Sequence, residues 1–187
     1  MKNTYLTSTF EDADATLQRI EAAFGALSGA QLNWKPSAEV WSVGQCLDHL
    51  ISSDEEYFSQ LKAIAGGEKA SSFWEAIPLL PRFWGSFIRK AVHPDSQRKN
   101  KTFAVFEPSA SNLPETIVSD FKAHHRELID LITATDHVDH EKVILTSPVA
   151  RFMTYSLKDA VIILVTHMER HYRQAKAVTE RDGFPAA

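Results

Sequence analysis

The stretch THMERHYRQ, residues 166–174, places His167 and His171 four positions apart within a strongly apolar helical run. Residues at i and i+4 lie on the same face of an α-helix, so both imidazoles can reach one cation. Two imidazoles alone hold a divalent ion weakly, and a transition-metal site normally needs at least three protein ligands. The pattern therefore predicts a metal site with a third ligand from elsewhere, and His49 is the best candidate.

The position of Glu169 separates this motif from the His-Glu-x-x-His motif of zinc proteases. In those enzymes the glutamate directly follows the first histidine and serves as general base. Here Glu169 is the second residue after His167, and a residue at i+2 lies about 200° around the helix. The side chain should face away from the imidazoles, so the sequence argues against a protease.

Length and composition fit one globular domain spanning residues 1–187, with 44% hydrophobic and 24% charged residues. The net charge is -4 and the pI is about 6.1. The only basic cluster in the sequence is the short run 98–101, so the charge pattern does not indicate a nucleic-acid-binding surface. The apolar run 160–165 is far shorter than the roughly 20 residues that cross a bilayer. We expect a soluble, cytoplasmic protein with no nucleic-acid or membrane partner.

The single cysteine, Cys46, excludes an internal disulfide framework and is typical of a reducing compartment. It precedes His49 by three residues, on about the same side of a helix, so a nucleophilic role is one alternative. Free cysteine behaves more often as a small buried hydrophobic residue. We expect Cys46 in the core.

Four long amphipathic patterns, without any long alternating stretch, predict an all-α protein built as a four-helix bundle. Capping boxes mark the first two starts, at residues 8–11 and 42–45, and a proline in the first turn marks the third. The patterns begin at Ser8, Ser42, Pro114 and Ser156, and the first two end at Gly29 and Gly66. We expect the first two helices to pack together.

The region 71–110 differs, because four prolines forbid one long helix while seven Phe and Trp side chains supply apolar bulk. We expect one or two short helices and then an extended crossover, which would let the second and third long helices run in the same direction. The aromatic side chains would cover part of the bundle or form a subunit interface. Residues 136–148 should form a polar loop with a brief extended piece at 143–145.

The histidines of the candidate site lie at the margins of apolar helical stripes. His49 falls at the edge of its stripe beside Ser53 and Glu56, and His167 and His171 occupy a similar border. Such positions look into the seam between neighbouring helices, where bundles build metal sites. The geometry allows a three-histidine cluster, although a hydrogen-bonded boundary residue is the alternative for His49 taken alone.

Other histidines are weaker candidates. His124 and His125 are adjacent and diverge by about 100°, so at most one can face the site as a ligand or as a partner of one. The ligand-rich run 136–141 lies in a predicted loop without a rigid scaffold. A solvated acidic turn is the simpler interpretation there.

Two motifs together resemble the DinB-like (DinB/YfiT) superfamily of metal-binding four-helix bundles. They are Trp41-Ser42-x-Gly44-Gln45-x-Leu47-x-His49-Leu50 and His167-x-x-Arg170-His171-x-x-Gln174. The extended segment 101–108 and the helix over 121–131 also look like the middle portion of that family. The resemblance covers nearly the whole chain.

The resemblance implies an up-up-down-down bundle, commonly a homodimer, in which His49, His167 and His171 bind a divalent metal, often zinc or nickel. Related groups include transferases and isomerases that use a low-molecular-weight thiol such as mycothiol or bacillithiol. Others are described as metal-dependent hydrolases without a known substrate. The sequence shows no motif that selects one thiol or one substrate.

Three neutral imidazoles leave a coordination position open, which is typical of a catalytic site. A metal there can activate water or present a thiol as thiolate, and the resemblance favours transfer of a low-molecular-weight thiol to a small electrophilic substrate. A hydrolase and a non-catalytic metal-binding or dimerisation module are the alternatives. Gln174 and Glu56 would orient imidazoles or substrate, and the alternative is that both are exposed to solvent. Trp41 would form one wall of the pocket or anchor the start of the helix.

Overall fold

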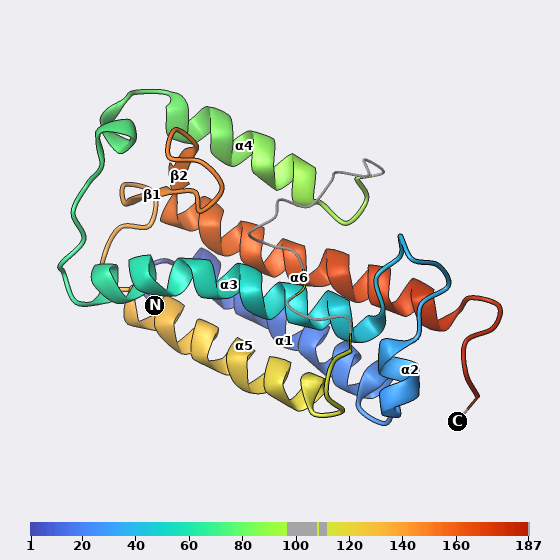
Figure 1. Ribbon diagram of the computed structural model, residues 1–187. Coiled ribbons are helices and arrows are strands. Elements are labelled where there is room, and N and C mark those ends of the chain that lie inside the picture. Colours follow the sequence, from blue (N-terminus) through green and yellow to red (C-terminus); the bar gives the residue numbers. More distant parts are fainter. Residues whose placement is uncertain (97–107, 109–111, 187) are drawn as a thin grey trace.

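The computed structural model describes residues 1–96, 108 and 112–186, and this part of the chain is predominantly helical (Figure 1). The long helices are α1 (Tyr5–Phe24), α3 (Val43–Ala65), α5 (Ile117–Ala134) and α6 (Leu157–Thr179). The shorter elements are α2 (Gly29–Asn33), the 3-10 helix η1 (Phe73–Ala76), α4 (Leu80–Val92), β1 (Ile144–Thr146) and β2 (Thr154–Ser156). The extended crossover predicted over 101–108 lies outside the described residues, apart from Pro108.

The four long helices lie side by side, with α1 and α3 on opposite corners (Figure 1). Each of α1 and α3 packs against both α5 and α6. The expectation that α1 and α3 would pack together as a neighbouring pair is therefore wrong, because α5 and α6 lie between them. The arrangement leaves α3 and α6 in direct contact, and this contact carries the candidate site.

The second and third long helices, α3 and α5, run in the same direction as expected, but the overall order differs from the up-up-down-down order that the resemblance implied. Contacts in which the residue numbers rise together on both helices show that α3 runs parallel to α5, and that α1 runs parallel to α6. The pairs are Asp54–His124 and Lys62–Glu127 for the first two helices, and Arg19–Glu169 and Phe24–Tyr172 for the other two. The chain turns back through α2 between α1 and α3, so these two run antiparallel and the order is up-down-down-up (Figure 1).

Local capping chemistry sets the starts of α3 and α6 as predicted. Ser42 accepts the backbone N–H of Gln45 at 3.1 Å, and the Gln45 side chain accepts the N–H of Ser42 at 3.2 Å. Ser156 accepts the N–H of Asp159 at 3.0 Å at the start of α6. These caps fix the phase of the two helices that carry the three histidines.

Three other predicted boundaries are wrong by a few residues. The helix α1 begins at Tyr5, where the Ser8 hydroxyl donates to the Tyr5 carbonyl instead of capping the helix. Gly29 begins α2, because Ser28 forms a capping box there, and α5 begins at Ile117 after Pro114. Short-range side-chain bonds compete with caps, so such starts are hard to locate from sequence.

Short elements cover the α6 side of the long helices. The helix α4 packs on α6 and β2, and β1 pairs with β2 in an antiparallel register that matches Leu145 with Tyr155. The strand β1 overlaps the extended piece predicted at 143–145 and lies one residue further along the chain. The core forms two clusters of buried apolar side chains, one around Phe24 and Phe121 and the other around Ile132 and Tyr155. None of the described helices is long and apolar enough to span a membrane.

Candidate metal centre

The structure brings His49 of α3 together with His167 and His171 of α6. The Nε2 atom of His167 lies 3.2 Å from Nε2 of His49 and 2.9 Å from Nε2 of His171. The three ring centroids are 4.4 to 5.0 Å apart. Residues from two distant parts of the sequence therefore present nitrogen atoms to one point between two helices.

This nitrogen arrangement fits the size of a metal ion. Zinc–imidazole bonds of about 2.0–2.1 Å at tetrahedral angles place ligand nitrogens roughly 3.3 Å apart. One candidate ligand atom from each histidine lies within 4.8 Å of the others, and within the described residues these three form the group of His, Cys, Asp and Glu side chains that could hold an ion. The set supplies three nitrogen donors and leaves a fourth position for another ligand.

Enclosure favours the neutral, ligating form of the imidazoles. His49 is 3% exposed and His171 is 7% exposed, while His167 is half-buried. Desolvation, and then the neighbouring His49 and Arg170, hold the pKa of His167 well below its ordinary value. The pKa of His171 is likewise lowered well below its ordinary value by desolvation, by the other two histidines and by Arg170. Neutral imidazole is the form that binds metal, so the three side chains can act as metal ligands at neutral pH without first losing a proton.

Trp41 covers one side of the cluster. Its ring stacks on His171 at 5.8 Å with an interplanar angle of 23°, and it lies 4.9 Å from the ring of His49. The tryptophan immediately precedes the Ser42 cap, so the capping box positions it against the site. Trp41 also packs against the apolar core, so its contacts fit both roles considered for it, the wall of the site and the anchor of the helix start.

Ser53 is a residue whose role the sequence did not reveal. It follows His49 by one helical turn on α3, and its hydroxyl lies 3.4 Å from Nδ1 of His49. A partner at Nδ1 restrains the ring and would direct the Nε2 lone pair toward a bound ion. The i+4 spacing was visible in the sequence, but a serine at that spacing is too common to indicate this function.

Within the described residues, neither Gln174 nor Glu56 hydrogen-bonds to the three histidines, so neither orients an imidazole, and a role toward a substrate stays a prediction. Glu56 is exposed on α3, and Gln174 is half-buried without a hydrogen bond to the three histidines in the described structure. Glu169 accepts a hydrogen bond from Arg19 of α1 at 2.6 Å and another from Arg173, one turn further along α6, at 2.7 Å. The carboxylate of Glu169 is thus engaged away from the site, as its i+2 position predicted.

Arg170 fastens α4 to the helix that carries two of the histidines. Its guanidinium donates to the carbonyl oxygens of Ala91, His93 and Ser96, at 3.2, 3.2 and 3.4 Å. Carbonyl groups at a helix C-terminus lack intrahelical donors, and a cation there also opposes the negative end of the helix dipole. The arginine in the second motif thus holds the end of α4 against α6.

His124 and His125 lie away from the cluster and contact other partners. His124 stacks on Phe58 at 5.0 Å, and its Nε2 lies 3.8 Å from Oδ2 of buried Asp54. Burial raises the pKa of Asp54 well above its ordinary value and lowers the pKa of His124, so the pair is held largely neutral. His125 is 3% exposed beside Phe121, and burial lowers its pKa to about 4.

The ligand-rich run 136–141 anchors the N-terminal segment instead of forming only a solvated turn. Asp136 accepts the backbone N–H groups of Lys2 and Asn3 at 2.7 and 2.9 Å. His140 is fully buried between Tyr5, whose hydroxyl lies 2.7 Å from Nδ1, and Thr135. The interpretation of this run as a solvated acidic turn is therefore wrong at His140.

Cys46 is buried in the core as expected, at 0% exposure. Burial raises the pKa of its thiol to about 12, so it stays protonated at neutral pH. A protonated, inaccessible thiol is neither a nucleophile nor a metal ligand.

Comparison with known proteins settles the family. The sequence model of the DinB superfamily matches residues 12–175. The chain belongs to the DinB superfamily. The matched range contains His49, His167 and His171, and the resemblance inferred from the two motifs is confirmed. No curated protein and no solved structure matches this DinB-superfamily chain.

Proposed function

We propose that this protein is a divalent-metal-dependent enzyme that transfers a low-molecular-weight thiol to a small electrophilic substrate. The observation that carries the proposal is the convergence of three Nε2 atoms, from His49, His167 and His171, at 2.9 and 3.2 Å. Zinc or nickel suits such a site, because imidazole is a good ligand for both. A divalent ion bound there would lower the pKa of a coordinated thiol or water molecule.

The surrounding residues favour thiol transfer over hydrolysis. The single cysteine is buried with a pKa of about 12, so the chain itself offers no competing thiolate and the nucleophile would come from a bound small molecule. Glu169, the carboxylate nearest in sequence to the ligand pair, is held by Arg19 and Arg173 and is not placed to serve as general base. Trp41 shields one side of the histidines from water, which protects a thiolate from protonation.

The test is a reaction of zinc- or nickel-loaded protein with 1-chloro-2,4-dinitrobenzene in the presence of bacillithiol, mycothiol, cysteine or glutathione. Thiol sulfur forms a bond to the ring carbon, chloride leaves, and the thiol proton passes to buffer. We expect metal-dependent turnover with at least one thiol and loss of turnover in His49→Ala. The exposed His137→Ala is the matched control and should keep full activity.

The same experiment separates the two alternatives. Turnover of p-nitrophenyl acetate without added thiol, lost in His49→Ala, would replace thiol transfer by hydrolysis. Tight metal binding without turnover in either assay would assign the chain as a non-catalytic metal-binding module. Absence of metal binding would contradict the thiol transferase, the hydrolase and the metal-binding module alike.

We further propose that the protein is a homodimer that associates through aromatic side chains around α4. Several large apolar residues there are exposed, namely Phe73, Leu79, Phe83, Phe87 and Phe152. Contiguous exposed aromatic surface of this kind is typical of an interaction site. Light scattering should give a dimer for the natural chain and a monomer for the double variant Phe83→Ser and Phe87→Ser, and an unchanged mass would contradict this interface.

A further inference from the structure

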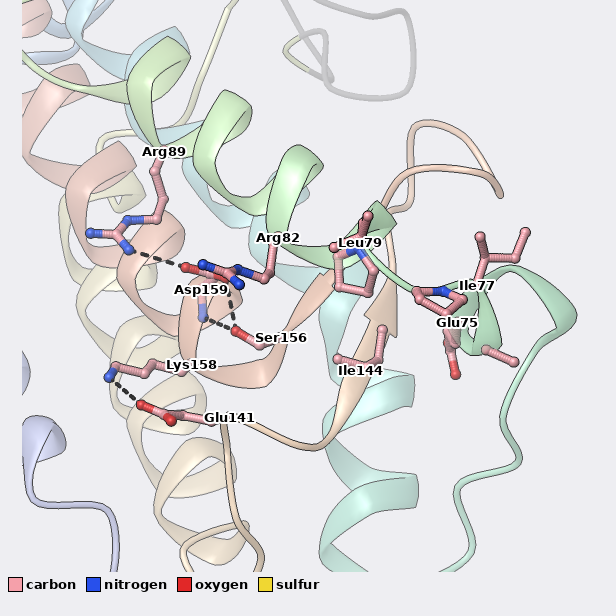
Figure 2. A pocket seen from close by; sticks show the side chains of 13 residues that line it. Glu75, Ile77, Leu79, Arg82, Arg89, Glu141, Ile144, Ser156, Lys158 and Asp159 are labelled. Atoms are coloured by element: carbon pink, nitrogen blue, oxygen red, sulfur yellow. Dashed lines mark hydrogen bonds and ion pairs between the residues drawn. The ribbon is translucent and has the colours of Figure 1, made fainter.

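A groove of about 710 Å³ lies between α4 and α6, lined by residues other than the three histidines. Its lining includes Arg82, Arg89 and Lys90 of α4 and Thr166 of α6. A second hollow of about 520 Å³ shares Arg82, Arg89 and Asp159 with the groove and extends toward η1 (Figure 2). Volumes of this size accommodate a small molecule.

The acidic side chains of the groove are already engaged by cations. Asp159 accepts a hydrogen bond from Arg89 at 3.1 Å and another from the Ser156 hydroxyl at 2.9 Å (Figure 2). Asp95 accepts from Arg173 at 2.9 Å. Neither carboxylate is therefore available to neutralise the remaining cations of the groove.

The adjoining hollow shows the same pattern. Glu141 is paired with Lys158 at 2.7 Å (Figure 2). Glu75 is paired with Lys69 at 2.6 Å. These pairs leave the hollow without surplus negative charge.

Arg82 and Lys90 supply the surplus positive charge. Both side chains are exposed, and within residues 1–96 and 112–186 neither forms an ion pair. Arginine binds carboxylate or phosphate in a planar, two-point geometry, and lysine provides a point charge. In a chain of net charge -4, this groove is a local positive site suited to an anion.

The groove is built on firmly packed helices. Arg82, Ser86 and Arg89 recur every three or four residues, so they lie on one face of α4. Gly85 lets α4 approach α6 closely, because a Cβ atom there would lie 2.5 Å from Oδ2 of Asp159. Together with the Arg170 contacts described above, this packing fixes the spacing of the cationic side chains.

We propose that this groove binds a small molecule carrying two or more carboxylate or phosphate groups, with Arg82 and Lys90 as its main charge partners. The hydroxyls of Ser86 and Thr166 line the groove and provide further donors. Thr166 directly precedes His167, so the groove approaches the helix segment that carries the histidines. The site goes beyond the proposed metal chemistry and does not depend on a bound ion.

The test is a calorimetric titration of the full-length, metal-free protein at constant ionic strength, with citrate as the carboxylate probe and pyrophosphate as the phosphate probe. We expect saturable binding of at least one probe, weakened at least about tenfold by Arg82→Ala and by Lys90→Ala, because each removes charge-assisted hydrogen bonds. Arg126→Ala removes the same charge from an exposed position of α5 and should bind like the natural chain.

Two results would overturn this site: absence of saturable binding with both probes, or an equal loss in Arg126→Ala. His49→Ala provides a separate readout, because it leaves the groove intact and should retain anion binding. Loss of anion binding in that variant would also contradict the groove. Retained anion binding in a protein that never binds metal would count against the proposed enzyme alone.

Discussion

The three-histidine cluster and the outer face of α4 depart from ordinary burial in opposite ways. The cluster buries polar rings, with His49 at 3% and His171 at 7% exposure. The α4 face exposes apolar rings, with Phe83 at 61% and Phe87 at 48% exposure. The first lies between two long helices, and the second belongs to a short helix on the outside of the assembly (Figure 1).

Both regions contain side chains whose burial or exposure does not stabilise the isolated chain. Buried polar groups are costly unless they are hydrogen-bonded or bind an ion, and Nδ1 of His171 has no partner among the described residues. Exposed aromatic rings lose the gain of burial. Both departures fit the functions proposed above, in which a cation would bind the cluster and a second copy of the chain would cover the α4 face.

The largest expected effect compares the same substitution in the core beside the cluster and on the α4 face. Phe24 is fully buried and packs on Tyr172, one residue after His171, so Phe24→Ala should lower the free energy of unfolding by about 3–5 kcal/mol. Phe83→Ala should lower it by less than about 1 kcal/mol. Urea unfolding measures both, and similar losses would contradict the assigned burial.

The second prediction uses a buried histidine outside the cluster. The pKa of His125 is about 4 in the folded protein, against about 6.5 when unfolded. Above pH 6.5 both states are neutral, but between pH 6.5 and 4 only the unfolded state gains the proton. This difference should lower the free energy of unfolding by about 3 kcal/mol over that range.

His125→Leu removes this proton-linked loss while retaining an apolar side chain at a buried position. Urea unfolding at pH 7 and pH 4 should therefore show a smaller fall for the variant than for the natural chain. The exposed His137→Leu is the control. An identical fall in all three proteins would show that His125 is not held neutral by burial.

The smallest expected effect concerns the hydrogen bond that orients His49. Ser53→Ala should weaken metal binding by about tenfold, because partners of ligating imidazoles typically contribute 10- to 100-fold. Ser52→Ala is the control, since Ser52 donates to the carbonyl of Asp48 on the same helix. Chelator competition measures both affinities, and equal values would remove Ser53 from the site.

Much of the candidate site could be predicted because regular helices determine it. The i,i+4 spacing of His167 and His171, the capping box at Ser42 and the N-cap at Ser156 are local, and local geometry follows directly from sequence. The position of His49 at the edge of an apolar stripe indicated that its helix faces the one that carries His167 and His171. Periodicity thus predicted which histidines could meet.

The rest depends on contacts between distant segments. The diagonal placement of α1 and α3 follows from how α2 turns the chain, and no periodicity encodes that turn. His140 was misjudged because its partners Tyr5 and Thr135 come from separate helices. The cationic groove was missed for the same reason, since Arg82 and Thr166 line one groove only when α4 packs on α6.

The most direct test of the central claim is X-ray absorption of the cobalt-substituted protein, combined with measurement of metal stoichiometry. We expect one ion per chain, with three imidazole nitrogens at about 2.0–2.1 Å and an exchangeable fourth ligand. His49→Ala should show two imidazoles and a much weaker affinity. An unchanged spectrum and full metal retention in His49→Ala would contradict the assignment of these three histidines as one metal centre.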